Sequence, residues 1–317
     1  MRSGILLAVV LGGTSGVVAD TLHVPGDFPT IQEAIDAAVD GDEVEVHPAT
    51  YNENINFLGK AIRVYSTDGP DVTIIEAQQP GPVVTCNSAE GPDSVLEGFT
   101  ITGGNSGIGG GMQNINSSPT VTDCTFSGNF AFVGGGMGND ASNPTVTNCT
   151  FSGNAADFHG GGMYNDSSSP MVINCTFSGN AAGFNGGGMH NFSGSSPTVT
   201  NCTFSENTSA DDGAGMYNSF SSPTVTDCTF TANTAGFRGG GIFLSDGSMT
   251  VTNCTFEGNS TPVLGQHGGG AIWIQDSQVN LVDCDLHDNE GYHGGAVAFV
   301  QFFGEGASLT LIGCSVT

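Results

Sequence analysis

Basic residues are almost absent from this chain. Its 317 residues include 4 Lys and Arg against 31 Asp and Glu, which gives a formal net charge of −27 at pH 7. Such a surface repels nucleic acid and acidic lipid, so we expect no nucleic-acid partner. It attracts divalent cations, and Ca²⁺ is the one cofactor that the composition leaves open. The simpler interpretation is a cofactor-free protein that its acidic surface keeps soluble, and no metal-ligand set is assigned.

Long apolar runs are also lacking, apart from one at the start. Arg2 is followed by an apolar run from Ile5 to Leu11 and by small residues that end at Ala19. This order predicts a secretory signal peptide over residues 1–19. The run is shorter than a membrane span, so we expect no transmembrane helix after cleavage and a secreted or cell-surface location.

A repeat dominates the rest of the chain. NCTFSGN, with small variations, returns at a period of about 26 residues from Asp123 onward, which is typical of a solenoid. The residue before each Cys, or its equivalent, is always Asn, Asp or Gly, and these types tolerate left-handed backbone. A left-handed corner is therefore expected between two short strands whose apolar side chains point inward. The corner residues are Gly98, Asp123, Asn148, Asn174, Asn201, Asp227, Asn253, Asp283 and Gly313.

Other columns complete each coil. Asn recurs three residues after each Phe and marks the next turn; a variable loop and a Gly-rich third strand follow, as in GGGMY from Gly160. Three strands and three turns per repeat predict an all-β parallel β-helix, in which equivalent side chains stack about 4.8 Å apart. The alternative, a β-sandwich, does not explain the column identities. The Asn column comprises Asn129, Asn154, Asn180, Asn207, Asn233 and Asn259.

The cysteines follow the same repeat. Nine Cys in an exported protein suggest disulfides. However, in-register strands point equivalent side chains the same way, and the number is odd, which favours a stack of buried thiols. Disulfides are the alternative, and the wide spacings without a His ladder argue against zinc.

Three regions follow along the chain. Residues 1–19 are the signal peptide, residues 20–97 an N-terminal cap with irregular first rungs, and residues 98–317 the regular rungs. Thr30 and Glu33 are placed as a capping box before an apolar stripe that includes Ile31 and Ile35, which predicts a short capping helix over the open end of the solenoid. The last rung stops after Cys314, so we expect a C-terminal truncation and a monomeric solenoid within a longer chain.

Two groups of proteins resemble this plan. TIQEAIDAAVDGDEVEVHPATYNENI is similar to the opening of secreted pectate-lyase-like right-handed β-helix proteins. The FSGN/FTAN and GGAI/GGGM motifs resemble the FxxN and GGAI repeats of chlamydial-type polymorphic outer-membrane proteins, which are surface adhesins. The resemblance covers nearly all of the chain after residue 19. It implies a right-handed single-stranded parallel β-helix from a bacterial exported protein.

For function, the resemblance implies an adhesin-like or polysaccharide-binding scaffold, or else a polysaccharide lyase or glycoside hydrolase. Pectate lyases hold calcium with acidic residues and use an Arg as base, and the pectin hydrolases carry an Arg-Ile-Lys motif. This chain lacks that motif, and Arg238 is the only basic residue in its repeats. We therefore expect a non-catalytic scaffold, with the enzyme as the alternative.

The candidate site lies where the repeat varies, in the loops before the Gly runs. A column of aromatic residues there lies beside a column of polar and titratable ones, which predicts a ridge that binds a polysaccharide or cell-surface glycan. The candidate ligand-binding residues are Phe158, His159, Phe184, Asn185, Asp212, Phe237, Arg238, His267, Tyr292 and His293. The catalytic candidates are Asp211, Asp212, Arg238 and His159, since a carboxylate with His can exchange protons and Arg can hold an anion.

A structural interpretation competes with this site. In it the Phe side chains pack over the Gly corner, and Asp212 and Arg238 form a surface ion pair that contributes little stability. The remaining histidines His23, His47 and His190 are interpreted as structural or solvated.

Overall fold

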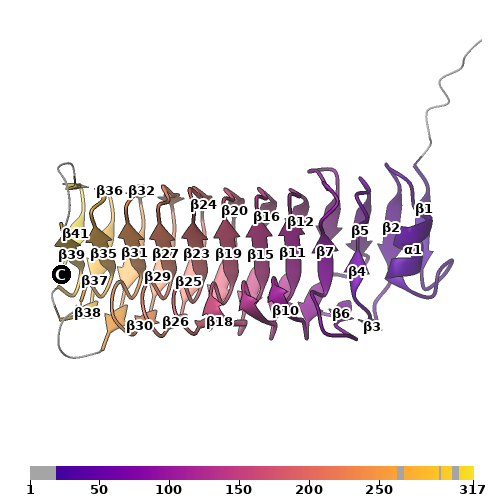
Figure 1. Cartoon of the computed structure of the whole chain (residues 1–317), viewed down its shortest axis with the longest axis horizontal. Coiled ribbons are helices and arrows are strands. Elements are labelled where there is room, and N and C mark those ends of the chain that lie inside the picture. The colour runs from indigo at the N-terminus through magenta and orange to yellow at the C-terminus, as the bar shows by residue number, and fades with distance from the viewer. Residues whose placement is uncertain (1–18, 263–267, 293, 302–306) are drawn as a thin grey trace, which may run out of the picture.

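The computed structural model describes residues 19–262, 268–292, 294–301 and 307–317, which form a long solenoid of stacked coils (Figure 1). Strands of four parallel sheets alternate along the chain, and equivalent strands of successive coils pair in register. The parallel β-helix prediction is therefore confirmed. Equivalent residues lie 25 to 27 positions apart from Asn114 to Asn218, as the hydrogen bonds between stacked Asn side chains show, and 30 apart from Asn259 to Asn289.

The 12-stranded sheet contains the Val column of the repeat. Its strands are β1 (Thr21–Val24), β2 (Glu43–Val46), β5 (Arg63–Ser66), β8 (Val95–Glu97), β12 (Thr120–Thr122), β16 (Thr145–Thr147), β20 (Met171–Ile173), β24 (Thr198–Thr200), β28 (Thr224–Thr226), β32 (Ser248–Thr252), β36 (Gln278–Val282) and β40 (Ser308–Ile312).

The 11-stranded sheet contains the Phe column. Its strands are β3 (Thr50–Asn52), β6 (Ile74–Glu76), β9 (Thr100–Thr102), β13 (Thr125–Ser127), β17 (Thr150–Ser152), β21 (Thr176–Ser178), β25 (Thr203–Ser205), β29 (Thr229–Thr231), β33 (Thr255–Glu257), β37 (Asp285–His287) and β41 (Ser315–Val316).

The 10-stranded sheet contains the strands that follow the Gly runs. Its strands are β4 (Ile55–Asn56), β7 (Val84–Cys86), β11 (Met112–Ile115), β15 (Met137–Asp140), β19 (Met163–Asp166), β23 (Met189–Phe192), β27 (Met216–Ser219), β31 (Ile242–Ser245), β35 (Ile272–Gln275) and β39 (Val297–Val300).

A fourth, 8-stranded sheet corrects the expectation of three strands per coil. The variable loop begins with a short strand, because its first residues continue the parallel hydrogen bonding of the coil below. These strands are β10 (Asn105–Ile108), β14 (Phe130–Val133), β18 (Ala155–His159), β22 (Ala181–Ala182), β26 (Thr208–Ser209), β30 (Thr234–Ala235), β34 (Ser260–Thr261) and β38 (Glu290–Gly291).

The left-handed corner between the 12- and 11-stranded sheets is confirmed. Asp123, Asn148 and Asn174 have φ values of 54°, 55° and 55°, and Gly98 and Gly313 have φ values of 79° and 65°. The corner turns the chain while the Val side chain before it and the Cys and Phe side chains after it stay buried, as at Val146, Cys149 and Phe151.

Side-chain ladders fill the interior. Six Phe rings from Phe126 to Phe256 stack with centroids 4.7 to 4.8 Å apart and are fully buried. Burial of each such side chain contributes about 2–3 kcal/mol. The buried Asn column that begins at Asn129 is also confirmed, and each amide bonds to the next. A second buried Asn ladder, which sequence reasoning missed, runs along the 10-stranded sheet through Asn114, Asn139, Asn165, Asn191 and Asn218.

All nine cysteines are free thiols, and all but Cys314 are buried. The thiol stack is confirmed. Seven of them, from Cys124 to Cys284, are buried in one column, where they fill the core as small apolar side chains.

The expected capping helix is present as α1 (Ile31–Ala37), which lies beside β1 and β2 at one end of the solenoid (Figure 1). The Thr30 hydroxyl accepts a hydrogen bond from the Glu33 backbone N–H at 3.2 Å, and Ile31, Ala34 and Ile35 are fully buried. With seven residues α1 is far shorter than a membrane span, and no helix in the described part of the chain has the length and apolarity to cross a bilayer.

Candidate functional site

The site lies where the 8-stranded sheet turns into the 10-stranded sheet. A Gly run makes this turn in every regular rung. The first residue of the run has a left-handed backbone conformation, which Gly tolerates, as at Gly160 with φ 68°. A Cβ on Gly162 would lie 2.5 Å from the Gly188 carbonyl oxygen and 2.9 Å from the Phe177 ring. The next side chain, Met163, points into the core, so that Tyr164 lies on the outer face of the sheet.

The aromatic floor is the row of rings on this outer face, namely Tyr164, His190, Tyr217, Phe243 and Trp273, which pair in register from rung to rung. Adjacent rings from Tyr164 to Phe243 stack with centroids 4.7 to 5.2 Å apart. His190, Phe243 and Trp273 are buried in this row, whereas Tyr164 and Tyr217 are partly exposed.

The phenylalanine ridge stands beside the floor and consists of Phe132, Phe158, Phe184 and Phe237. Backbone hydrogen bonds align Phe158, Phe184, Asp211 and Phe237 in one column. The first three rings of the ridge contact one another, with centroids 4.0 and 5.1 Å apart. Asp211 occupies the ridge position between Phe184 and Phe237, and its shorter side chain leaves a notch in the ridge.

The polar column, His159, Asn185, Asp212 and Arg238, lies between the ridge and the floor. Isolated bridges pair His159 with Asn185 and Asp212 with Arg238, and Asn185 Oδ1 accepts a hydrogen bond of 3.1 Å from the Asp212 backbone N–H. His159 is thus separated from Asp212 by one rung. In the described part of the chain, no carboxylate lies within hydrogen-bond distance of the His159 ring.

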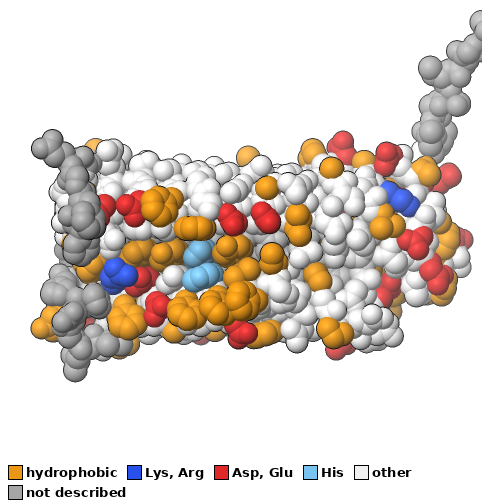
Figure 2. All heavy atoms as spheres, in the orientation of Figure 1, with side chains coloured by type: hydrophobic (Ala, Val, Ile, Leu, Met, Phe, Trp, Pro, Cys, Tyr) orange, Lys and Arg blue, Asp and Glu red, His pale blue; other side chains and the backbone are white. Residues whose placement is uncertain are grey.

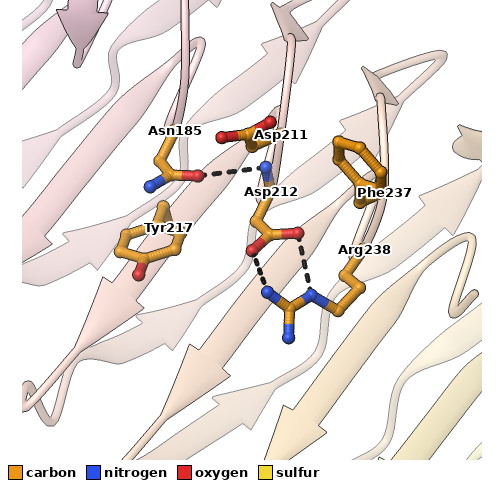
Figure 3. Close-up of a pocket in the computed structure, with 6 residues that line it drawn as sticks. All are labelled: Asn185, Asp211, Asp212, Tyr217, Phe237 and Arg238. Atoms are coloured by element: carbon orange, nitrogen blue, oxygen red, sulfur yellow. Dashed lines mark hydrogen bonds and ion pairs between the residues drawn. The ribbon is translucent and has the colours of Figure 1, made fainter. Parts of the chain in front are cut away.

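Asp212 and Arg238 form a bidentate pair, drawn in Figure 3. Arg238 Nε donates to Asp212 Oδ1 at 3.0 Å and Nη2 donates to Oδ2 at 2.6 Å, while Nη1 donates to Gln275 Oε1 at 3.0 Å. The guanidinium lies over the rings of Phe243 and Trp273. The ion pair that the structural interpretation predicts is therefore present, but Asp212 is only 5% exposed and so does not lie on the open surface.

Two hollows follow these columns. One, of about 440 Å³, is lined by Asn185, Asp211, Asp212, Tyr217, Phe237 and Arg238. The other, of about 180 Å³, is lined by His159, Tyr164, Asn185, His190, Phe192 and Tyr217. They share Asn185 and Tyr217 and so lie next to each other along the solenoid, and together they are called the groove. Figure 2 shows its setting, with two apolar rows on either side of His and Arg side chains.

Two histidines lie in the groove wall and floor. The His159 and His190 rings stack with centroids 4.6 Å apart, and the Nδ1 atom of each is buried without a hydrogen-bond partner. Desolvation lowers the pKa of His159, although the nearby Asp211 carboxylate opposes the shift, and desolvation lowers the pKa of His190 further. Both imidazoles are therefore neutral at pH 7.

This pair predicts a pH-dependent stability. A folded pKa below the unfolded value near 6.5 means that the unfolded chain binds the proton first, so stability falls as pH falls through about 6.5 toward the folded pKa. Thermal unfolding between pH 7.5 and 5.5 should show this loss. His190→Tyr, which copies Tyr164 and Tyr217 of the same row, should reduce it.

The control for this prediction is His287→Ala. His287 is paired with Asp288, which raises its pKa, so its loss removes a contribution of the opposite sign. A wild-type pH dependence in His190→Tyr would contradict the assignment.

Most of the predicted site residues are brought together by the fold. Phe158, Phe184 and Phe237 belong to the phenylalanine ridge, and Asp211 lies in the same column. The four residues of the polar column are also predicted site residues. Tyr292 is exposed and lines neither hollow. His267 and His293 lie outside the described residues.

Sequence reasoning missed the aromatic floor. The signal was the residue after Met or Ile in the third strand, which is aromatic in GGGMY, GGGIF and GGAIW. His190, which the sequence placed among the structural or solvated residues, is buried and stacked between Tyr164 and Tyr217, and it also lines the smaller hollow.

Metal ligands are sparse in the groove. Among the described residues that line the two hollows, Asp211 and Asp212 are the ones with carboxylates, and Arg238 already engages Asp212. Among the described residues, the one group of three potential ligand side chains is His23, Glu45 and His47, on the first strands of the solenoid.

Known proteins share this architecture. The family described as the right handed beta helix region matches residues 50–185, 116–285 and 163–317. No curated protein matches the sequence significantly. Among solved structures, pectate lyase Pel9A is 14% identical, with a TM-score of 0.59 over 92% of this chain and 80% of that one.

Two further structures are more distant. A pectin methylesterase from carrot is 13% identical over 92% of this chain and 90% of its own, with a TM-score of 0.47. A tailspike protein of an Escherichia coli bacteriophage is 12% identical over 95% of this chain and 42% of its own, with a TM-score of 0.44. At such identities the likeness concerns the fold alone. Together with the parallel solenoid, the family match shows that the chain belongs to the right-handed β-helix family.

Proposed function

We propose that this protein is an exported, non-catalytic scaffold that binds a polysaccharide in the groove. The observation that carries the proposal is that the two hollows are neighbours on successive rungs and share Asn185 and Tyr217 in their linings. A groove along the solenoid axis suits an extended ligand, because successive rungs present side chains at a fixed spacing along it. Aromatic side chains with a few placed polar groups are typical of ligand sites.

The notch at Asp211 is the proposed centre of binding. Phe184 and Phe237 flank it two rungs apart, which corresponds to about 9.6 Å at the spacing of paired strands. This separation accommodates one sugar ring between two aromatic side chains. The Asp211 carboxylate can accept hydrogen bonds from sugar hydroxyls, and the Asn185 amide faces the same hollow (Figure 3).

Charge favours a neutral polysaccharide over a uronate polymer. Arg238 is the only basic residue in the groove, and Asp212 neutralises it through the bidentate pair. The Asp211 charge remains, on a chain whose net charge is −27. A polyanion would meet like charge in the notch, and like charge in an interface opposes binding.

Acid–base catalysis has less support than binding. The Asp212 carboxylate holds Arg238 with both oxygens, so it is poorly placed to take a proton from a substrate. His159 is neutral, but Asn185 separates it from Asp212. Polysaccharide lyase or hydrolase activity is therefore an alternative outcome of the binding test described next.

The test is a binding panel on immobilised or soluble polymers. We expect the chain to bind at least one neutral polymer among glucan, xylan and mannan, and to bind polygalacturonate and alginate weakly with or without Ca²⁺. Release of unsaturated products or of reducing ends would instead favour the enzyme. Failure to bind any polymer would contradict the proposal.

Removal of one flank of the notch should weaken binding. Phe237→Ala deletes an exposed ring at the larger hollow, and we expect about a tenfold loss of affinity for the polymer that binds, since a central contact residue is truncated. Met171→Thr is the matched control: it removes an exposed apolar side chain from the 12-stranded sheet and restores the Thr found at Thr145 and Thr198 in register. Titration calorimetry measures both, and equal effects would contradict the assignment.

A further inference from the structure

Three ligand-type side chains meet on the outer face of the first strands, at the end of the solenoid that carries α1 (Figure 1). His23 of β1 pairs in register with Glu45 of β2. Val44 and Val46 are buried, so Glu45 faces outward. His47 is the first residue after β2 and lies two residues beyond Glu45. This alternation brings both imidazoles to the Glu45 carboxylate.

The distances suit a shared ion. Glu45 Oε1 lies 3.1 Å from His23 Nδ1 and 3.6 Å from His47 Nε2, and the three ligand atoms all lie within 4.8 Å of one another. Two ligand atoms that each lie 2.0–2.1 Å from a tetrahedral ion are about 3.4 Å apart. A small adjustment of the side chains would therefore place all three around one ion.

The surroundings hold these side chains in place. The Tyr65 hydroxyl donates to Glu45 Oε2 at 2.6 Å, which leaves Oε1 directed at the two histidines. The His47 backbone N–H donates to the Val24 carbonyl oxygen, and its carbonyl oxygen accepts from the Tyr51 hydroxyl at 2.8 Å. Hydrogen bonds to a ligating carboxylate are typical of built metal sites.

The nearby positive charge is already compensated. Arg63 lies over the Tyr65 ring, but it pairs with Glu43 at 3.1 Å and with Glu97 at 2.9 Å. A divalent cation at Glu45 would therefore meet a locally acidic surface.

We propose that His23, Glu45 and His47 bind a divalent transition-metal ion, with Tyr65 as a positioning residue. Two imidazole nitrogens and one carboxylate oxygen suit Zn²⁺, Cu²⁺ or Ni²⁺ better than the all-oxygen preference of Ca²⁺. On binding, the proton of His23 Nδ1 moves to Nε2 or to solvent, and water fills the remaining coordination positions. This site is separate from the groove and does not depend on polysaccharide binding.

The test uses the full chain without an affinity tag and ZnCl₂ as the probe in titration calorimetry. We expect one Zn²⁺ per chain. Tyr65→Phe should weaken binding about tenfold, as for the loss of a hydrogen bond to a ligand. His23→Ala and His47→Ala should weaken it more, and the double substitution should abolish this site.

The matched control is His287→Ala. His287 and Asp288 also form an exposed His–carboxylate pair, at 3.1 Å, but no third ligand joins them among the described residues. This substitution should leave Zn²⁺ binding unchanged, and metal-free thermal unfolding checks that each variant folds.

Electron paramagnetic resonance of bound Cu²⁺ identifies the ligands directly. We expect hyperfine coupling to two imidazole nitrogens and the loss of one with each single His variant. Absence of stoichiometric Zn²⁺ binding, or binding that survives in the His23→Ala/His47→Ala variant, would overturn the proposal.

Discussion

Replacement of Asn180 by Asp should lower the free energy of unfolding by about 3–5 kcal/mol. Asn180 is fully buried, and its Nδ2 donates to the Phe151 carbonyl oxygen at 2.9 Å and to Asn207 Oδ1 at 3.0 Å. Asp keeps the oxygen that accepts from Asn154 but turns a second oxygen toward these two acceptors. If the Asp is ionised, its charge is buried without a partner, and if it is protonated, its single O–H must serve two acceptors. Either state accounts for a loss of this size in the free energy of unfolding. Urea unfolding measures it.

The same rung supplies the control. Asn174→Asp makes the same chemical change at the exposed corner, where φ is 55° and where Asp123, Asp227 and Asp283 occupy equivalent positions. We expect a change below about 0.5 kcal/mol, as for most surface substitutions. If Asn180→Asp were equally mild, the buried Asn ladder would not be a main source of stability.

Replacement of Arg238 by Met should lower stability by about 2–4 kcal/mol. It leaves the Asp212 carboxylate, 5% exposed, without its bidentate partner, and removal of one member of a buried pair costs more than the pair itself contributes. The Asp212→Asn/Arg238→Met double variant should recover most of the loss, because no unpaired charge remains. Fluorescence of the single Trp, Trp273, reports unfolding at this place, since its ring lies 5.7 Å from the guanidinium.

Arg63→Met is the matched control for that experiment. Arg63 also pairs with carboxylates, but Glu43 and Glu97 are both partly exposed, so water can solvate them after the substitution. A loss below about 1 kcal/mol is expected. Equal losses at Arg63 and Arg238 would contradict the role assigned to burial.

The core of the fold could be predicted because its columns consist of identical residues. The corner at Asn148, the Phe151 ring and the Asn154 amide each stack on the same residue type in the next rung, so one repeat defines them all. The 8-stranded sheet could not be predicted from the sequence, because strands such as β22 and β26 have only two residues, and these vary in type. Their pairing follows from the position of the coil and not from their own pattern.

For a related reason, only part of the candidate site could be predicted from the sequence. The ridge and the polar column lie in aligned loops, where their variation stands out. The aromatic floor lies on the strands that follow the Gly runs, and the Gly runs themselves predict only a turn. The burial of Asp212 depends on Arg238, which packs over Phe243 and Trp273 of later segments, and such contacts are not encoded in the loop that contains either residue.

The most direct test of the binding groove is Asp211→Phe. The substitution completes the phenylalanine ridge between Phe184 and Phe237, so it fills the notch with a side chain that the column already accepts. In titration calorimetry with the polymer selected by the panel, we predict at least about a tenfold loss of affinity, or ~1.4 kcal/mol, with an unchanged or raised unfolding temperature. Wild-type affinity in this folded variant would contradict the account, because the notch would then not be where the polysaccharide binds.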